Sequence, residues 1–300
     1  MLGKIKDLAK IVLTVRNWPI VLAALVLGGQ AKVNFRKGEV TPVFACSDWG
    51  PLMSYVNFFR YFPDAAINGS VATINWRSRK VSLDFGWLTP GELGEVFGQE
   101  SYRQYFGDDF AGKTVLDIGA AFGDSIVWFG LNGARKVIGI EPLPSFAELC
   151  RKNIALNNIG GSCEVVEAGV GALPLVDLRQ DKTFQTVFAG YSHLASEFDK
   201  KAVPILTLAD LAVRYDLKDA WLKVDCEGWE YDFLLGASKD LLRLFEKIVI
   251  EYHYGFEKLE TKLKEAGFVI SAEPPHDVLA PERSGEYRNM RVGMMSATRQ

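Results

Sequence analysis

The sequence predicts an α/β protein, in which a mostly parallel sheet is covered by helices on both faces and is preceded by a smaller α+β extension. From Lys113 onward, short apolar segments alternate with glycine turns and helical segments, as in strands joined by crossover helices. Residues 30–112 instead carry short mixed segments bounded by turn residues. A chain of 300 residues can bury one large core and one smaller one. We therefore expect an N-terminal extension at 1–112 and a main domain at 113–300.

The main domain is expected to hold seven strands, the last of them antiparallel. The expected strands are 114–118, 136–140, 163–167, 220–224, 247–251, 268–271 and 290–297. The expected helices are 124–131, 145–157 and 257–266, with 231–235 inside a further helix. Segment 272–289 contains Pro and Gly and is expected to be a connection without strands.

The extension is expected to mix helices with hairpins. The segments Ala31–Phe35 and Val40–Ala45 flank a turn at Arg36–Gly38 and predict a hairpin. Apolar residues recur at intervals of three and four between residues 50 and 62, which predicts a helix with one buried face. A second hairpin is expected from 71–76 and 80–85, and a continuous helix from 92–106.

The N-terminus combines positive charge with an apolar run. Ile20–Leu27 follows four basic residues, namely Lys4, Lys6, Lys10 and Arg16. The uncharged stretch Asn17–Ala31 contains Pro19 and is shorter than the roughly 20 apolar residues that span a bilayer. We expect a packed helix here. An interfacial membrane helix and a signal or anchor segment are the alternatives.

Composition narrows the class of protein. The 34 basic residues do not outnumber the 37 acidic ones, so sequence-independent binding to nucleic-acid phosphates is not expected. Four cysteines without C-x-x-C pairs indicate reduced thiols and a cytoplasmic protein, which would be peripheral to a membrane in the interfacial alternative.

A glycine turn marks the expected cofactor site. In Val115–Ser125 the order is D-x-G-x-x-x-G, formed by Asp117, Gly119 and Gly123. Glycines at a strand-to-helix turn let a ligand approach the backbone. This spacing differs from the G-x-G-x-x-G that cradles a diphosphate. An acidic residue before the turn favours a cationic ligand such as S-adenosylmethionine (SAM), since it would repel a diphosphate.

Other cofactor contacts are expected at the neighbouring strand ends. Glu141 ends the second strand, where doubly wound folds place the acid that binds ribose hydroxyls. A helix cap is its structural alternative. Glu167 and Ala168, after the third strand, are candidates to face the adenine. The remaining candidates for cofactor binding are Ala120, Asp124, Ser125, Pro142 and Asp225.

The segment Trp221–Ala237 resembles the hallmark of the FkbM methyltransferases. The matching residues are Lys223, Asp225, Glu227, Gly228 and Glu230. The resemblance extends through VLDIGAAFGDS, GIEP, LTLADL and IVIEYH, so it covers most of residues 113–270. It implies a class I methyltransferase Rossmann-like sandwich that uses SAM. It also implies O-methylation, often of a sugar or secondary-metabolite hydroxyl.

Candidate catalytic residues lie at the ends of the fourth and fifth strands, where open parallel sheets bind ligands. We expect His253 to act as general base, with Asp225 and Glu227 beside it. Glu227, Glu230 and Glu251 are expected to contact the acceptor. We predict no metal site, although hard oxygen ligands with one imidazole could hold magnesium. The alternative for His253 is a hydrogen-bonded histidine at the sheet end.

Other segments are candidates for binding the acceptor, and two other functions are also compatible with the sequence. The loop containing Tyr191, Ser192 and His193 is a candidate acceptor-side loop, with a solvated loop as the alternative. The N-terminal extension is a candidate acceptor-binding cap. The rival functions are an NAD(P)-linked oxidoreductase and a non-catalytic nucleotide-binding module. A small-molecule or glycan hydroxyl is the expected partner.

Overall fold

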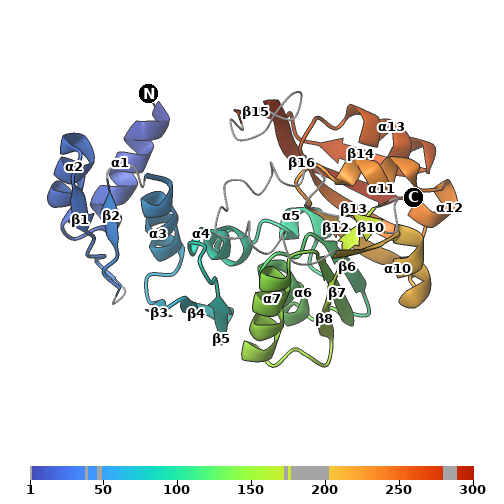
Figure 1. The fold of residues 1–300 in the computed structure, drawn as a ribbon, viewed down its shortest axis with the longest axis horizontal. Helices are drawn as coiled ribbons and strands as arrows, with labels where there is room; N and C mark the ends of the chain where they lie inside the picture. Colours follow the sequence, from blue (N-terminus) through green and yellow to red (C-terminus); the bar gives the residue numbers. More distant parts are fainter. Residues whose placement is uncertain (1, 38–39, 46–48, 172–174, 177–202, 280–288) are drawn as a thin grey trace. The chain divides into compact units, whose positions relative to one another are not determined.

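The computed structural model describes residues 2–37, 40–45, 49–171, 175–176, 203–279 and 289–300 (Figure 1). The chain divides into two compact units. The smaller comprises Met1–Gln104 and Ala155–Asn157, and the larger comprises Tyr105–Ile154 and Asn158–Gln300.

The smaller unit contains the N-terminal helix, the helix near 50–62 and the two hairpins that the sequence predicts. Its elements are α1 (Leu2–Thr14), α2 (Trp18–Leu27), β1 (Gln30–Lys32), β2 (Val43–Ala45), α3 (Trp49–Tyr61), β3 (Ala66–Asn68), β4 (Val71–Trp76), β5 (Arg79–Asp84), α4 (Gly91–Leu93) and the π-helix η1 (Gly94–Gly98). Both hairpins are confirmed, since β1 pairs with β2 and β4 with β5, each antiparallel. The turn of the second hairpin has positive φ at Arg77 and Ser78, as a two-residue type I′ turn requires.

The expected continuous helix at 92–106 is wrong. The segment is broken into α4, η1 and a short helix α5 (Arg103–Phe106). A Cβ on Gly98 would lie 2.6 Å from the Tyr61 ring, so a glycine allows the backbone to approach α3 closely. Glu100 then adopts a φ of 51°, which ends helical geometry.

The larger unit is built on one large sheet. Its strands run in the order β14-β16-β13-β12-β6-β7-β8, with β15 pairing to β16 at one side. The bounds are β6 (Thr114–Ile118), β7 (Lys136–Glu141), β8 (Cys163–Glu167), β12 (Ala220–Val224), β13 (Phe245–Tyr252), β14 (Phe268–Ala272), β15 (His276–Leu279) and β16 (Asn289–Arg299). Among the described strands of this sheet, β16 alone breaks the parallel order, because it is antiparallel to β13, β14 and β15. The expected mostly parallel sheet with an antiparallel last strand is confirmed.

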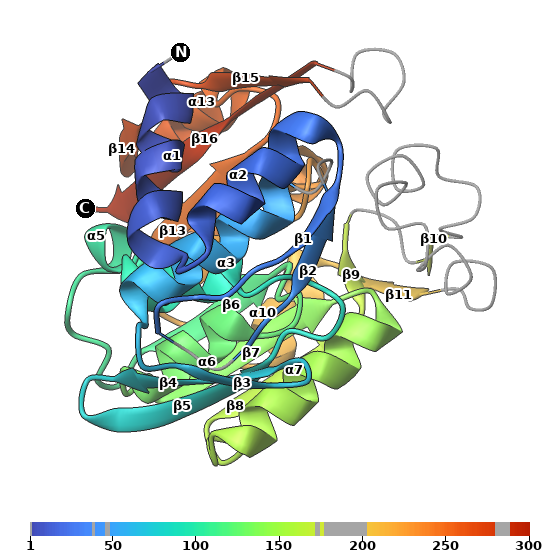
Figure 2. The ribbon, with the colours of Figure 1, turned by 90° about the vertical axis from the view of Figure 1, so that its left-hand side faces the viewer.

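Helices cover both faces of this sheet (Figures 1 and 2). They are α6 (Asp124–Leu131), α7 (Pro144–Leu156), α10 (Leu208–Arg214), α11 (Glu230–Gly236), α12 (Lys239–Leu242) and α13 (Glu257–Glu265). On one face, Leu222 shares a core with Leu211 of α10 and Leu259 of α13. On the other face, Gly139 lies against Ile126 of α6. Alternating strand residues therefore point to two different cores.

Two features of the larger unit were not expected. Segment 272–289 contains β15, so the expectation of a connection without strands is wrong there. A second sheet, in the order β10-β11-β9, is formed by β9 (Gly169–Val170), β10 (Leu175–Val176) and β11 (Val203–Leu206).

The larger unit begins at Tyr105, earlier than the predicted boundary at Lys113. Phe106 and Phe110 already belong to its core, because each ring lies 5.3 Å from the Trp221 ring. The short segment before the first strand therefore closes one face of the sheet.

None of the helices in the described part of the chain is both long and apolar enough to cross a membrane. The apolar run at 20–27 lies in α2, which has 10 residues.

Candidate active site

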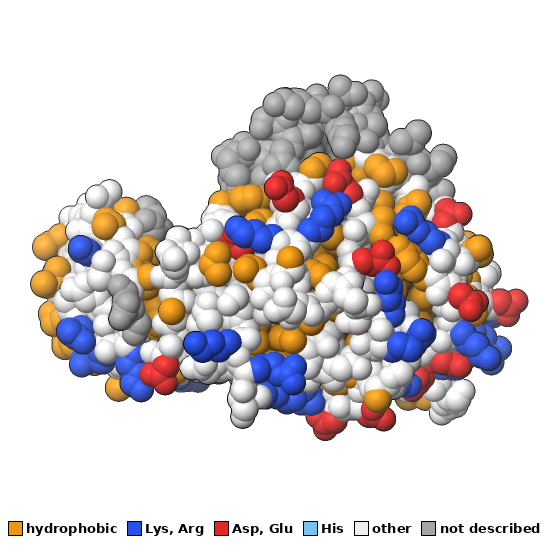
Figure 3. Space-filling view, turned by 90° about the horizontal axis from the view of Figure 1, so that it is seen from below, with side chains coloured by type: hydrophobic (Ala, Val, Ile, Leu, Met, Phe, Trp, Pro, Cys, Tyr) orange, Lys and Arg blue, Asp and Glu red, His pale blue; other side chains and the backbone are white. Residues whose placement is uncertain are grey.

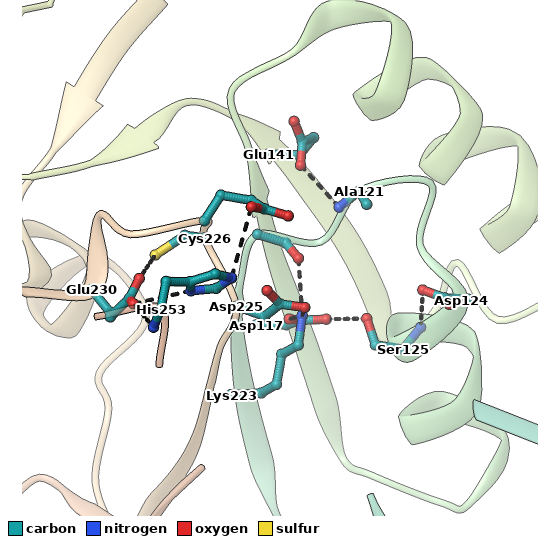
Figure 4. A network of polar contacts seen from close by, with 12 residues as sticks. Asp117, Ala121, Asp124, Ser125, Glu141, Lys223, Asp225, Cys226, Glu230 and His253 are labelled. Carbon is teal, nitrogen blue, oxygen red and sulfur yellow. Dashed lines mark hydrogen bonds and ion pairs between the residues drawn. The ribbon is translucent and has the colours of Figure 1, made fainter. Parts of the chain in front are cut away.

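Most of the candidate side chains converge where four neighbouring strands end (Figure 4). Strands β13, β12, β6 and β7 are adjacent and parallel in the sheet. Their carboxyl ends therefore meet along one edge, and the loops that follow them carry the polar residues.

A buried ion pair joins the ends of β6 and β12. The ammonium of Lys223 lies 3.0 Å from Oδ1 of Asp117, 3.9 Å from Oδ2 of Asp225, and donates to the Gly119 carbonyl at 2.9 Å. Ser125 donates to the other oxygen of Asp117 at 2.5 Å. Burial raises the pKa of Asp117, and Lys223 and Ser125 offset part of that rise. This pairing holds the first turn against the fourth strand.

The glycine turn leaves no room for side chains. Gly119 has a φ of +80°, and a Cβ there would lie 1.7 Å from the Asp225 carbonyl oxygen. Gly123 has a φ of +86°, and its Cβ would lie 2.6 Å from the sulfur of Cys150. Both glycines are thus required by the fold itself, because no other residue fits that backbone and space.

Glu141 reaches back over the same turn. One carboxylate oxygen accepts from the Ala121 backbone N–H at 2.9 Å, and the other accepts from Leu143 N–H at 2.8 Å. Burial raises the pKa of Glu141 to about 7, against the effect of these two donors. The contact to Leu143 lies just before α7, so part of the helix-cap alternative is present. Each oxygen keeps a second lone pair for a ligand.

The other expected cofactor contacts surround this turn. Ala120 and Ala168 are buried, and Ala168 donates to the Glu141 carbonyl at 3.1 Å. Asp124 begins α6 and is buried. Pro142 follows Glu141, and Glu167 ends β8 with an ion pair to Arg151 at 3.5 Å.

The loop after β12 presents Glu227 to solvent. Glu227 has a φ of +60° and its side chain is 49% exposed. Its carboxylate lies 3.7 Å from Nε2 of His253. Gly228, at a φ of +108°, packs closely under the Tyr254 ring. The strained backbone brings an accessible carboxylate beside the histidine.

His253 and Glu230 form a fully buried pair. One oxygen of Glu230 accepts from the His253 backbone N–H at 2.9 Å and lies 3.0 Å from its Nδ1. The other accepts from the Gly228 N–H at 2.9 Å and from the Cys226 thiol at 3.5 Å. A carboxylate can only accept, so Nδ1 carries the proton. In a neutral ring, the lone pair is then on Nε2, which faces Glu227.

The charge of His253 is set by these neighbours. Burial alone would lower the pKa of His253, but the charge and hydrogen bond of Glu230, with Glu227 and Asp225, more than offset this and raise the pKa to about 9. The imidazole is therefore mostly protonated at neutral pH, whereas the expected base role needs a neutral ring. A base role requires that this proton leave first.

Glu230 and Glu251 are placed differently from each other. Glu230 was expected to contact the acceptor, yet its carboxylate is directed to His253 inside the protein. Glu251 is half-buried on β13, opposite Met294 of β16. Tyr191, Ser192 and His193 lie outside the described residues. Within the described part, no cluster of three potential metal ligands is present.

Sequence reasoning gave Lys223 no site role of its own. The sequence indicates Lys223 only as part of the family hallmark. Its signal was available, because a lysine inside the otherwise apolar strand Ala220–Val224 is rare unless it is paired. The structure makes it the central cation of the acidic site (Figure 4).

Comparisons with known proteins show which family the chain resembles. The family model of the methyltransferase FkbM domain matches residues 117–270, just over half of the chain. Methyltransferase 1 of Beauveria bassiana is 28% identical over 181 residues, covering 51% of this chain and 72% of that protein. The protein arginine N-methyltransferase PRMT10 of Arabidopsis thaliana is 38% identical over 66 residues, covering 22% of this chain. The chain thus spans only 17% of the length of that relative.

Solved structures with a similar fold include other methyltransferases. A tRNA methyltransferase of M. jannaschii matches with a TM-score of 0.41 and 14% identity, covering 83% of this chain and 65% of that one. The precorrin-6y C5,15-methyltransferase of Geobacter metallireducens matches with a TM-score of 0.34 and 15% identity, covering 63% and 82%. Scores this low support no inference about the acceptor.

Proposed function

Because this chain belongs to the FkbM methyltransferase family, we propose that it transfers a methyl group from SAM to a hydroxyl oxygen of a sugar, glycan or secondary metabolite. The observation that carries this proposal is the buried Glu230–His253 pair, whose Nε2 faces the accessible Glu227 beside the acidic turn. Residues 1–112 are proposed to contribute to acceptor binding, and a cytoplasmic location remains our prediction.

The acidic turn fits SAM by its chemistry. Glu141 has a free lone pair on each oxygen, which suits two ribose hydroxyls. Asp117 and Asp225 share the cation Lys223, so the site keeps net negative charge for a cationic ligand. Bound there, SAM would supply an electrophilic methyl group on a sulfonium sulfur.

His253 is proposed to take the proton of the acceptor hydroxyl. Glu230 fixes the ring through Nδ1, so only Nε2 can receive a proton from the acceptor. The acceptor oxygen would form its bond to the methyl carbon as the bond from that carbon to the sulfonium sulfur breaks and a neutral thioether leaves. The O–H bond would break as well, and its proton would pass to Nε2 of His253. Glu227, 3.7 Å from Nε2, would orient the hydroxyl and stabilise the imidazolium that forms. Glu230 is thus a positioning residue.

The proposal is tested by methyl transfer from labelled SAM to a panel of glycans and small hydroxyl compounds. We expect label on oxygen with wild type, and loss of that label with His253→Ala. His276→Ala is the matched control, because His276 is exposed on β15. Label found only on nitrogen, or equal loss with both variants, would contradict the proposal.

A further inference from the structure

Helix α2 carries an apolar surface that the smaller unit leaves uncovered. The helix has the sequence WPIVLAALVL without a single charge, and Val21 is its one buried residue. Ile20 is 63% exposed, Val26 82% and Leu27 83%. With Pro19 and Ala23, which are also exposed, these residues recur at helical spacing and form one stripe. We call this the α2 stripe.

Positive charge surrounds the α2 stripe. Residues 1–37 contain seven basic residues and one acidic residue, in a chain whose net charge is −3. Lys6, Arg16 and Lys32 are exposed on the segments next to α2. The one acid, Asp7, is paired with Lys10 at 3.0 Å. Figure 3 shows hydrophobic side chains at the left-hand edge, where α2 lies in Figure 1, with Lys and Arg close by.

We propose that the α2 stripe docks this protein onto an anionic lipid bilayer, with α2 lying in the plane of the interface. A helix of 10 residues is too short to span the bilayer, but an apolar face with basic neighbours is suited to its surface. Trp18 begins the helix, and tryptophan favours the headgroup level. Exposed cations add attraction to anionic headgroups.

A second copy of the chain fits this surface less well. Self-association through the α2 stripe would bring the same basic segment of two molecules together, with like charges facing each other. An anionic bilayer instead matches both properties of the segment, since it receives apolar side chains and neutralises the lysines and arginines. The positive charge near the α2 stripe therefore favours an anionic bilayer over a second copy of the chain.

The test is co-sedimentation of the full chain with vesicles of phosphatidylcholine alone or with about 30% phosphatidylserine. We expect binding to the anionic vesicles that weakens with added salt. The triple variant I20S/V26S/L27S should bind at least about tenfold more weakly, since it removes most of the apolar stripe. The matched control V213S/V269S changes two exposed valines of the larger unit, 84% and 52% exposed, and should bind as wild type.

The replaced side chains are exposed, so the triple variant should fold, and a circular dichroism spectrum and unchanged SAM affinity check this. The R16Q/K32Q variant provides a second arm and should also lose binding to anionic vesicles, by about fivefold for each of the two positive charges removed. Wild type that stays in solution with anionic vesicles would overturn the proposal. So would a triple variant that binds fully, or wild-type dimers that the triple variant abolishes without any vesicle binding.

Discussion

The variant Glu230→Gln tests how the buried pair controls the reaction. The glutamine side chain would keep a similar shape and one acceptor oxygen but would remove the charge that faces His253. Burial lowers the pKa of His253, and Glu230 is the largest of the contributions that raise it. We therefore expect that pKa to fall in the variant. The neutral ring would then form at a lower pH.

The size of the effect on stability follows from the shift in the pKa of His253. The pKa of His253 lies at about 9 against an ordinary 6.5, a difference of about 2.5 pH units. At about 1.4 kcal/mol per pH unit, the raised pKa corresponds to roughly 3–4 kcal/mol of stability. A raised histidine pKa stabilises the folded state fully below pH 6.5, and this contribution is lost as pH rises through about 9. The variant should therefore lose up to that amount at about pH 6 and much less at about pH 10.

Two assays measure the protonation of His253. In wild type, kcat should rise with pH through about 9, because only the neutral ring accepts a proton. In Glu230→Gln the rise should move to lower pH. NMR titration gives the pKa directly, and the chain has three histidines, so His253→Asn identifies the signal. An unchanged pKa of His253, or a shifted pKa without a shift in the kcat profile, would refute the reasoning.

Three further variants test the remaining parts of the site. Glu141→Ala should weaken SAM binding by about 1–3 kcal/mol. The SAM affinity of the wild type should rise as pH passes about 7, where Glu141 ionises, and this rise should be absent in the variant. An unchanged affinity in calorimetry would mean that the ribose is held elsewhere. His253→Ala should keep SAM affinity and lower turnover by about 10²- to 10⁴-fold, and full activity with the true acceptor would exclude it as base. Lys223→Met should cost about 3–5 kcal/mol in urea unfolding, because Asp117 loses its buried counter-ion; an unchanged midpoint would contradict that role.

The middle of the parallel sheet could be predicted because its strands are buried on both faces. The half-buried edge strand at 163–167 appears with its predicted bounds. Segments 114–118 and 220–224 are buried throughout and also have the predicted bounds. Such strands are nearly continuous apolar runs between turns, and this pattern is visible in a single sequence. The order of the strands then follows from the family's fold.

Elements that depend on distant contacts could not be predicted. The interruption of the helix at 92–106 depends on how closely Gly98 approaches Tyr61, which the local pattern does not contain. Strand β15 is four residues long and pairs only with β16 among the described strands. Its short sequence, HDVL, carries too little alternation to distinguish it from a connection.

The location of the candidate site at the strand ends could be predicted, but the contacts between its side chains could not. Asp117 and Glu141 follow from strand ends and spacing, since the carboxyl ends of parallel strands meet at one edge. The contact between Glu230 and His253 joins residues 23 positions apart. It depends on the orientation of α11, so the sequence predicted only that Glu230 would contact the acceptor.

Calorimetric titration of the full chain with SAM, and separately with NAD, tests the central claim most directly. We predict one SAM bound per chain, with affinity that falls in Glu141→Ala, and no binding of NAD. Binding of NAD without binding of SAM would contradict the account, because an acidic turn built around Asp117, Glu141 and Asp225 should repel a diphosphate.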